Sequence, residues 1–398
     1  MDIGLFFWGS CFINDAGMDG PDPYDRHHTP EDFAEAYHAL KDWAKLADRH
    51  GYHSFWLTEH HFQREGYEII PNGLMLGAII AQHTEQIKFG SFFHQVPTWH
   101  PLRMAEDFAT ADIMTGGRML FGAGRGSVQR EMPIFGTTFG RNGDAEDQQN
   151  RDLFEEQMEI MKLAWSKKSF SYQGAHYTIP APGYLNTGHP ATGRPFSEIS
   201  LVPAPVHPVQ IYQALGSEPT FHYAAQQRHI GVMPLFNHKV TLPKWQRFGE
   251  LMAQYQEREV RPGEGRMLVT RTHIADSKEE AIRRIRPGHD ERYRFLAQQR
   301  PIGGYLTETG EPFPFGRIPT LEESMGQGSW LVGTVEEVRD GMLALKEQFG
   351  LEAMAVEMGY SGMSKSEVSE QIARFAVEVM PALQADSAAS PLEPVAAG

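Results

Sequence analysis

The feature that most constrains this chain is a regular alternation of short apolar runs with amphipathic stretches, repeated eight times. The runs are near-continuously apolar and too short for helices, which predicts strands buried on both faces. Strands of this kind, each followed by a helix, form a parallel sheet, and eight of them favour a closed (β/α)8 barrel, an α/β fold. A doubly wound open sheet is the alternative. The expected strands begin at 3, 55, 87, 118, 209, 231, 267 and 353.

Two stretches depart from this alternation. Residues 168–208 follow the fourth helix and are rich in Pro and Gly, which predicts an insertion on the barrel with a hairpin near Gln173 and Gly174. Residues 287–328 follow strand seven and a helix expected to end near Ile285, and they lack periodicity. A loop of that length is usually functional or disordered. We therefore expect one barrel domain over 1–384, with a lid-like segment at 287–328, and a disordered tail over 385–398.

Composition narrows the function classes. The formal net charge of −15 repels nucleic acid and anionic membranes, so neither is an expected partner. Cys11 is the single cysteine, which rules out an internal disulfide and favours a reducing, cytoplasmic setting. No apolar run reaches membrane-spanning length, and the first residues lack the layout of a signal peptide.

Polar residues follow the second strand directly, in the run Glu59-His60-His61. In parallel α/β proteins, ligands bind at the carboxyl ends of strands, so these side chains are candidates for chemistry. Adjacent residues of a strand point to opposite sides, which disfavours a shared metal ion and favours one imidazole in the site with the other supporting it. His94 and His100 from the next loop keep a metal-hydrolase barrel open as an alternative, although we expect no metal.

Two loops favour an anion. After strand four, Arg125 stands among glycines in Gly122–Gly126, where the backbone can approach a ligand and the guanidinium can bind phosphate. After strand five, the run 216–220 (Gly-Ser-Glu-Pro-Thr) opens a helix, whose N-terminus attracts anions unless Ser217 simply caps it. Glu218 would repel an anion, so its carboxylate is expected to point away. Together the loops suggest a phosphate-bearing cofactor.

Aromatic residues gather at or near the expected strand ends. Core packing accounts for any one of them, but collectively they can wall a flat ring system and exclude water. They are Phe6, Trp8, Phe92, Phe93 and Trp99.

These pieces together resemble the bacterial luciferase-like family of flavin-dependent monooxygenases. The resemblance covers roughly residues 1–235 and the last ~70 residues, on a barrel of the size usual for the fold. It rests on the order and spacing of Glu59–Phe62, Pro97–Pro101, Leu120–Gly126, Leu331–Thr334 and Val379–Pro381.

The resemblance implies reduced FMN, supplied by a separate flavin reductase, and O2, which form a flavin C4a-hydroperoxide that oxygenates a small organic substrate. It makes His60 the catalytic imidazole, with Glu59 and His61 beside it. It also implies a homo-oligomer, most simply a dimer, and a mobile lid at 287–328. Arg125 would grip the FMN phosphate, with contacts from Gly216, Ser217, Glu218 and Thr220; a cis peptide would join Phe92 and Phe93 under the flavin; Trp8, His94 and Trp99 would line the substrate pocket.

The sequence departs from the family pattern in places. Phe92 and Phe93 stand where family members often have small residues, which predicts a narrower or more aromatic pocket. The phosphate loops follow strands four and five, whereas barrels more commonly bind phosphate after strands seven and eight. An F420-dependent oxidoreductase on the same fold and a non-catalytic flavin-binding subunit remain alternatives.

Overall fold

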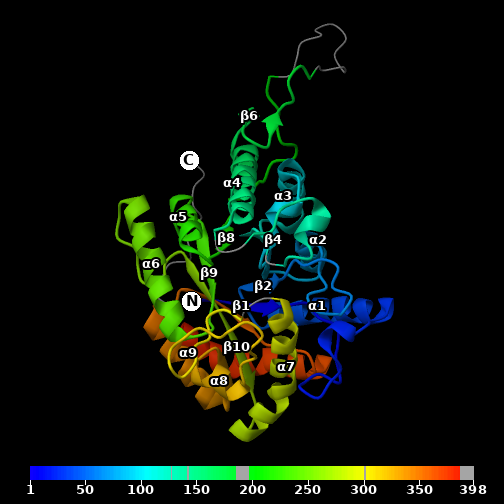
Figure 1. Ribbon diagram of the computed structural model, residues 1–398, viewed down its shortest axis with the longest axis vertical. Helices are drawn as coiled ribbons and strands as arrows, with labels where there is room; N and C mark the ends of the chain where they lie inside the picture. Colours follow the sequence, from blue (N-terminus) through cyan, green and yellow to red (C-terminus); the bar gives the residue numbers. More distant parts are fainter. Residues whose placement is uncertain (127, 141–142, 185–196, 300–301, 386–398) are drawn as a thin grey trace.

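A closed parallel barrel forms the centre of the molecule (Figure 1). The computed structural model describes residues 1–126, 128–140, 143–184, 197–299 and 302–385. Within these ranges eight strands pair in the order β1-β2-β3-β5-β8-β9-β10-β12, and β12 pairs with β1 to close the ring. The predicted (β/α)8 barrel is confirmed, and the open sheet is wrong. The strands are β1 Asp2–Phe7, β2 Ser54–Leu57, β3 Lys88–Ser91, β5 Met119–Gly124, β8 Ile211–Ala214, β9 Ile230–Pro234, β10 Arg266–Ile274 and β12 Ala353–Glu357.

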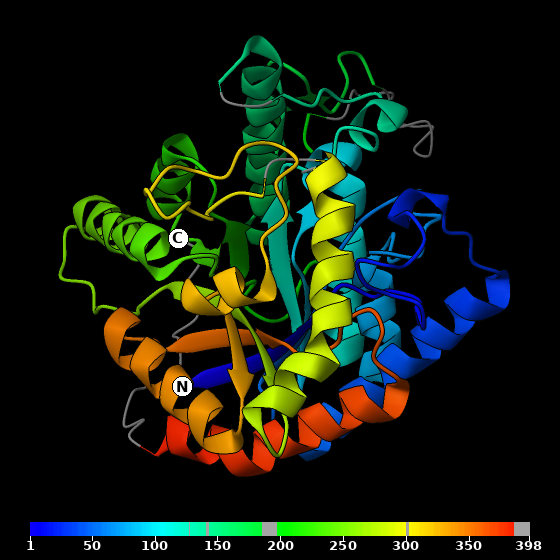
Figure 2. The ribbon, with the colours of Figure 1, turned by 60° about the horizontal axis from the view of Figure 1, so that its bottom comes forward.

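Helices follow the strands and cover the outside of the barrel, as the two ribbon views show (Figures 1 and 2). Local sequence explains their starts: Thr29 and Asp32 form a capping box at the first helix, and Pro30 occupies its first position. The main helices are α1 Pro30–Arg49, α2 Gly73–Ala81, α3 Pro101–Thr115, α4 Ala145–Ser166, α5 Glu218–Gln226, α6 His238–Gln256, α7 Lys278–Gln299, α9 Val335–Phe349 and α10 Lys365–Arg374, with the short α8 Leu321–Gly326 before strand β11 Trp330–Gly333 and α11 Met380–Gln384 at the end.

Two helices are longer than the sequence predicted. Helix α4 begins at Ala145, eight residues before the first expected apolar position, because Asp144 caps it and a polar first turn hides its start. Helix α7 does not end near Ile285 but continues through Pro287 to Gln299. Buried contacts hold its second half: Glu291 pairs with Arg26 in the loop after β1. Residues 287–299 of the lid-like segment are therefore helical.

The remaining departures are small. The predicted hairpin is confirmed as β6 Tyr172–Gln173 and β7 Thr178–Ile179, and Figure 1 shows it beyond the end of α4, away from the barrel. Strand β11 was missed; it pairs with the second half of β10. The predicted disordered tail falls outside the described residues, apart from Ala385. Among the described helices, none has the length and apolar character needed to cross a bilayer.

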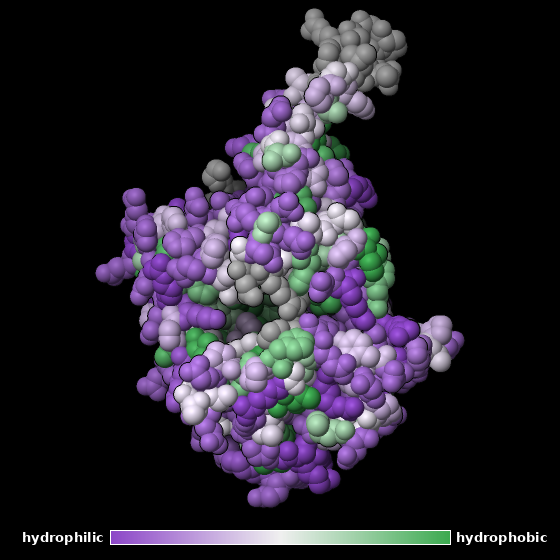
Figure 3. Space-filling view, viewed as in Figure 1, coloured by the Kyte–Doolittle hydropathy of each residue, from purple (hydrophilic) through white to green (hydrophobic). Residues whose placement is uncertain are grey.

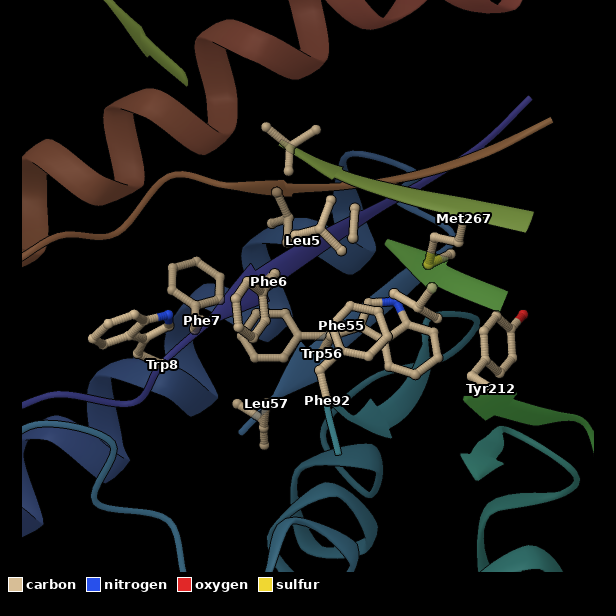
Figure 4. Packing of buried hydrophobic residues seen from close by; sticks show 14 of the residues in the cluster. Leu5, Phe6, Phe7, Trp8, Phe55, Trp56, Leu57, Phe92, Tyr212 and Met267 are labelled. Atoms are coloured by element: carbon tan, nitrogen blue, oxygen red, sulfur yellow. The ribbon is translucent and has the colours of Figure 1, made fainter. Parts of the chain in front are cut away.

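Aromatic side chains fill the inside of the barrel (Figure 4). The ring of Trp56 stacks on that of Phe92 with centroids 4.1 Å apart, and it meets the edge of Tyr212 from β8 at 4.7 Å. Phe6 approaches Phe92 at 5.5 Å from β1. A Cβ at Gly90 would lie 2.3 Å from the Trp56 ring, so only glycine leaves room for it. Because these rings close the interior, we place the candidate site at the carboxyl ends of the strands.

Candidate active site

The polar run after β2 is held inside the protein by its own contacts. Glu59 is 1% exposed and accepts hydrogen bonds from Nδ1 of His94 at 2.6 Å, Nε1 of Trp99 at 2.9 Å and the backbone N–H of Gln95 at 3.1 Å. Burial alone would raise the pKa of this carboxyl, but the His94, His61 and Trp99 donors outweigh it and lower the pKa to about 2. Glu59 therefore stays ionised and ties the end of β2 to the loop after β3.

His60 lies between two carboxylates. Its Nδ1 is 3.0 Å from Oε1 of Glu131, and its Nε2 is 3.4 Å from Oε1 of Glu68. Since both ring nitrogens face acceptors, the arrangement suits an imidazolium that donates on both sides. Glu131 is fully buried and also accepts from the side-chain amides of Gln63 and Gln95. Burial would raise the pKa of Glu131, yet its hydrogen bond with His60 and its other donors lower it.

His61 contacts a different set of side chains from His60. Its Nε2 is 3.8 Å from Oε1 of Glu59, and its ring meets that of Phe135 at 4.7 Å. Phe62 beside it has a φ of 60°, which is rare for a bulky residue, and is 53% exposed. Across the described ranges, no group of three or more His, Cys, Asp or Glu side chains is placed to hold a metal ion.

The peptide bond between Phe92 and Phe93 is cis, which confirms that prediction. Three residues were predicted to line a substrate pocket. Of these, His94 is buried at 1% exposure, with its Nδ1 hydrogen-bonded to Glu59. Trp99 is half-buried with its indole N–H turned to the same carboxylate. Trp8 lies under the guanidinium of Arg292, 3.6 Å from the ring centroid to Cζ.

Arg151 contacts the N-terminal turn of α5, and Asp147 joins Arg151 to Arg125. Nη1 of Arg125 is 2.7 Å from Oδ1 of Asp147, and Nη2 of Arg151 is 3.7 Å from the other oxygen. Arg151 also donates to Oγ1 of Thr220 at 3.3 Å, and Thr220 meets the hydroxyl of Ser217 at 3.1 Å. Sequence reasoning missed Arg151, because helix α4 was expected to begin after it; the cap at Asp144 was the available signal.

The start of α5 is not capped by Ser217, whose side chain accepts no helix N–H. The capping interpretation is therefore wrong, and the helix N-terminus remains available to an anion. The carboxylate of Glu218 points away as predicted: it is hydrogen-bonded to Nε of Arg247 at 2.8 Å, with its side chain 51% exposed. Burial and the neighbouring Arg125 lower the pKa of Arg151, which a bound anion would reverse.

The glycines around Arg125 do not all serve a ligand. A Cβ at Gly122 would lie 1.7 Å from the carbonyl oxygen of Ser91, and one at Gly124 would lie 2.8 Å from Cβ of Phe93. These two glycines let β5 pack against the end of β3, a packing role that the sequence analysis did not predict for them. At Gly216, by contrast, a Cβ would meet nothing within 4 Å.

We expect Gly122→Ala to lower the free energy of unfolding by about 1–3 kcal/mol, because the added methyl group overlaps a backbone carbonyl that cannot move aside. Gly216→Ala is the matched control and should leave stability within about 1 kcal/mol of the parent. Urea denaturation of the parent, Gly122→Ala and Gly216→Ala measures the three free energies of unfolding. Equal stability of the two variants would contradict the assignment of Gly122 to strand packing.

A space-filling view shows one face of the molecule hollowed between the part that carries α4 and α5 and the part that carries α7 and α8 (Figure 3). Around the hollow, hydrophobic and near-neutral side chains interrupt the charged surface. Such a mixture of apolar walls with a few polar groups is usual for small-molecule sites.

Comparison with known proteins identifies the family of this chain. Residues 18–352 match the family model described as luciferase-like monooxygenase. The oxygenase component of a flavin-dependent trigonelline monooxygenase from Acinetobacter baylyi is 24% identical over 87% of this chain and 90% of its own length. An uncharacterised protein of Sinorhizobium fredii is 33% identical, but that match spans only 38% of this chain and 42% of the relative.

Solved structures agree on the fold. The oxygenating constituent of 3,6-diketocamphane monooxygenase from Pseudomonas putida, in complex with FMN, has a TM-score of 0.73 at 20% identity over 96% of this chain and 98% of its own. An F420-dependent secondary alcohol dehydrogenase has a TM-score of 0.58 at 14% identity over 96% and 98%. The family match covers most of the chain, and the barrel and the order of its motifs agree with it; the chain belongs to the luciferase-like monooxygenase family.

Proposed function

We propose that this protein is the oxygenase of a two-component system. It takes reduced FMN from a separate flavin reductase and uses O2 to place one oxygen atom on a small organic substrate. The observation that carries the proposal is the cluster beside the N-terminus of α5: Arg151 donates to Thr220, Thr220 contacts Ser217, and Asp147 joins Arg151 to Arg125. The printed description of the A. baylyi relative as an oxygenase component supports the two-component arrangement.

The residues at α5 fit the phosphate of FMN. Two guanidiniums share the carboxylate of Asp147, so this carboxylate alone does not neutralise both. The hydroxyls of Ser217 and Thr220 lie with it, the helix N-terminus adds backbone donors, and Gly216 leaves open space beside them. Arg125 and Arg151 would therefore hold the phosphate in place of, or together with, their contacts to Asp147.

The residues after β2 would supply and position a proton donor beside the bound cofactor. Bound reduced FMN supplies the electrons with which O2 is activated. His60, held on both sides by Glu131 and Glu68, is the candidate proton donor, since imidazole is a common proton donor in catalysis and both of its ring nitrogens are fixed by these contacts. Glu59 fixes the position of residues 59–61 through its hydrogen bonds with His94 and Trp99. We do not assign it a proton-transfer role, because these bonds occupy its carboxylate and its pKa is lowered to about 2.

Replacing Arg151 with methionine tests the cofactor assignment. Losing a charge-assisted contact to phosphate costs about 1.5–3 kcal/mol, so the dissociation constant for reduced FMN should rise about tenfold to a hundredfold. Anaerobic fluorescence titration with photoreduced FMN measures it. Arg247→Met is the matched control: it removes a guanidinium that binds the outward Glu218, and FMN affinity should stay unchanged.

The same titration decides between cofactors. If reduced FMN binds and the complex consumes O2, the monooxygenase proposal stands. If F420 binds instead, and its reduced form in the complex is stable to O2, the protein is an F420-dependent oxidoreductase. If FMN binds but neither the parent nor any variant turns over with O2 and a reductase, the result favours a non-catalytic flavin-binding subunit.

A further inference from the structure

A second charged cluster lies at the ends of strands β10 and β12, apart from the residues at α5. Arg271 of β10 and Glu357 of β12 are register partners, and Glu357 is also the register partner of Phe6 in β1. Phe6 contacts the ring of Phe92 inside the barrel. Arg292 joins the cluster from α7. Arg271, Glu357 and Phe6 thus share one register level of the barrel, and Phe6 links that level to Phe92 of the cis peptide.

The cluster carries more positive than negative charge. Arg292 hydrogen-bonds Oε1 of Glu357, and Nε of Arg271 is 3.3 Å from Oε2 of the same carboxylate. Arg271 is 2% exposed, Arg292 8% and Glu357 1%. Glu291, the neighbour of Arg292 on α7, is paired with Arg26 instead. Two buried guanidiniums therefore share one carboxylate.

The other titratable groups around the cluster do not supply a second negative charge. Those nearest the two arginines are phenols, and burial raises the pKa of Tyr305 and Tyr360. The hydroxyls of Tyr293 and Tyr305 bond each other at 2.7 Å, and that of Tyr360 donates to the backbone oxygen of Glu357. The aromatic rings of Trp8 and Phe236 face Arg292 and Arg271, at 3.6 and 5.0 Å from ring centroid to Cζ. Stacking on rings suits a guanidinium but does not neutralise it.

Both guanidiniums hold unused donors. Within the described residues, Nη1 of Arg271 donates to the carbonyl of Leu235 at 3.0 Å, and Nη1 of Arg292 donates to Glu357. Nε of Arg292 is buried without a hydrogen-bond partner among the described residues, and Nε of Arg271 faces Oε2 of Glu357 at 3.3 Å without completing a hydrogen bond. A guanidinium has five N–H donors, and leaving buried charged donors unpaired is costly, so such groups usually mark a place for a ligand.

We propose that Arg271 and Arg292 form a subsite for the carboxylate of the organic substrate, beside the ring of Trp8. This rests on the proposed function, since it assigns the substrate class of the same barrel mouth: small organic monocarboxylates. One carboxylate would balance the single excess positive charge, whereas a doubly charged phosphate would leave a buried negative charge. Arginine also matches the planar, two-oxygen geometry of a carboxylate. The faces of Trp8 and Phe92 would pack the apolar remainder.

A charge series tests the subsite with benzoate as the anionic probe and benzamide as its neutral counterpart. Arg271→Met leaves the neutral Arg292–Glu357 pair and should weaken benzoate binding at least about tenfold, as expected for loss of one charge-assisted contact. Glu357→Gln adds one net positive charge and should tighten it. Benzamide should bind more weakly than benzoate to the parent and should respond little to either change. Isothermal titration calorimetry of the full chain gives all the affinities.

Arg286→Met is the matched control. It removes a guanidinium from the same helix, where Arg286 pairs with Glu322 on the surface, and benzoate affinity should not change. Thermal unfolding of each variant separates loss of binding from loss of fold. If Arg271→Met does not fold, the tighter benzoate binding expected for Glu357→Gln still tests the subsite. Equal affinity for benzoate and benzamide, or affinities that do not follow the order of charge, would overturn the subsite and leave a structural ion triad.

Titration with reduced FMN in the same variants keeps the two proposals apart. Arg271→Met should bind FMN like the parent, and Arg151→Met should bind benzoate like the parent. Charge-dependent benzoate binding in a protein that binds no flavin would reject the proposed function, and with it the assignment of the subsite to an oxygenation substrate. Flavin binding with no charge-dependent benzoate binding would reject the subsite alone.

Discussion

Replacing Glu59 with glutamine should lower the free energy of unfolding by about 3–5 kcal/mol, the usual cost of removing one partner from a buried, hydrogen-bonded ion pair. The carboxylate accepts hydrogen bonds from His94, Trp99 and the backbone of Gln95. A glutamine keeps one acceptor and places an amide donor where the second oxygen was. His94 then loses its anionic partner inside the protein.

The pH dependence of stability gives the same prediction an independent check. The pKa of Glu59 is about 2 in the folded protein, against 4.5 for the ordinary carboxyl. A group whose folded pKa is depressed stabilises the fold above its unfolded pKa, and that contribution is lost as pH falls through the folded pKa. For Glu59 the window runs from about pH 4.5 down to about pH 2, and the linkage term is about 3 kcal/mol.

Urea denaturation at pH 7 and at pH 3 measures both effects. The parent should lose part of its stability between these pH values through Glu59, and Glu59→Gln should lose correspondingly less. Glu218→Gln is the control, because its exposed pair with Arg247 is worth less than about 1 kcal/mol. A stability of Glu59→Gln within 1 kcal/mol of the parent at pH 7 would refute the role assigned to this carboxylate.

The barrel was predictable because most of its strands are near-continuously apolar, and that pattern depends on little beyond burial on both faces. Helix ends were less predictable. Pro287 would normally end a helix, yet the buried pairing of Glu291 with Arg26 from a distant loop holds α7 together beyond it. Tertiary contacts of this kind leave no periodic signal in the sequence.

The candidate site was predictable where residues follow a strand directly, and not where they arrive from elsewhere. Glu59, His60 and His61 follow the end of β2 after one residue, so their place at the carboxyl end of the strand could be predicted. Glu131 binds His60 from a loop 71 positions later, and Arg151 reaches Thr220 from inside a helix that was expected to start after it. Only the folded chain brings these partners together.

The second prediction with a large expected effect concerns His60 as a proton donor. Replacing it with glutamine should slow O2 consumption by protein-bound reduced FMN about 10²-fold or more, the lower range of what a positioned proton donor contributes. Glutamine retains a side-chain donor toward Glu131 but cannot release a proton to a reacting group. Stopped-flow mixing with O2, with protein in excess so that all FMN is bound, measures the rate constant.

The pH profile of that rate constant identifies the imidazole. If His60 gives the proton, the rate in the parent should fall as pH rises, and in His60→Gln the profile should be flat. Glu131→Gln removes a negative charge that favours the imidazolium, so it should move the fall to lower pH while leaving it visible. Glu131 would thereby be shown to act through His60 as a positioning residue.

His61→Gln is the matched control, since His61 faces Glu59 and Phe135 on the other side of the chain and should change neither the rate constant nor its pH profile substantially. FMN affinity should be the same in the parent and all three variants, because none of the changed residues contacts the arginines at α5. An unchanged rate and profile in His60→Gln would mean that the imidazole only packs between its carboxylates. The proton would then have to come from another group at the mouth of the barrel.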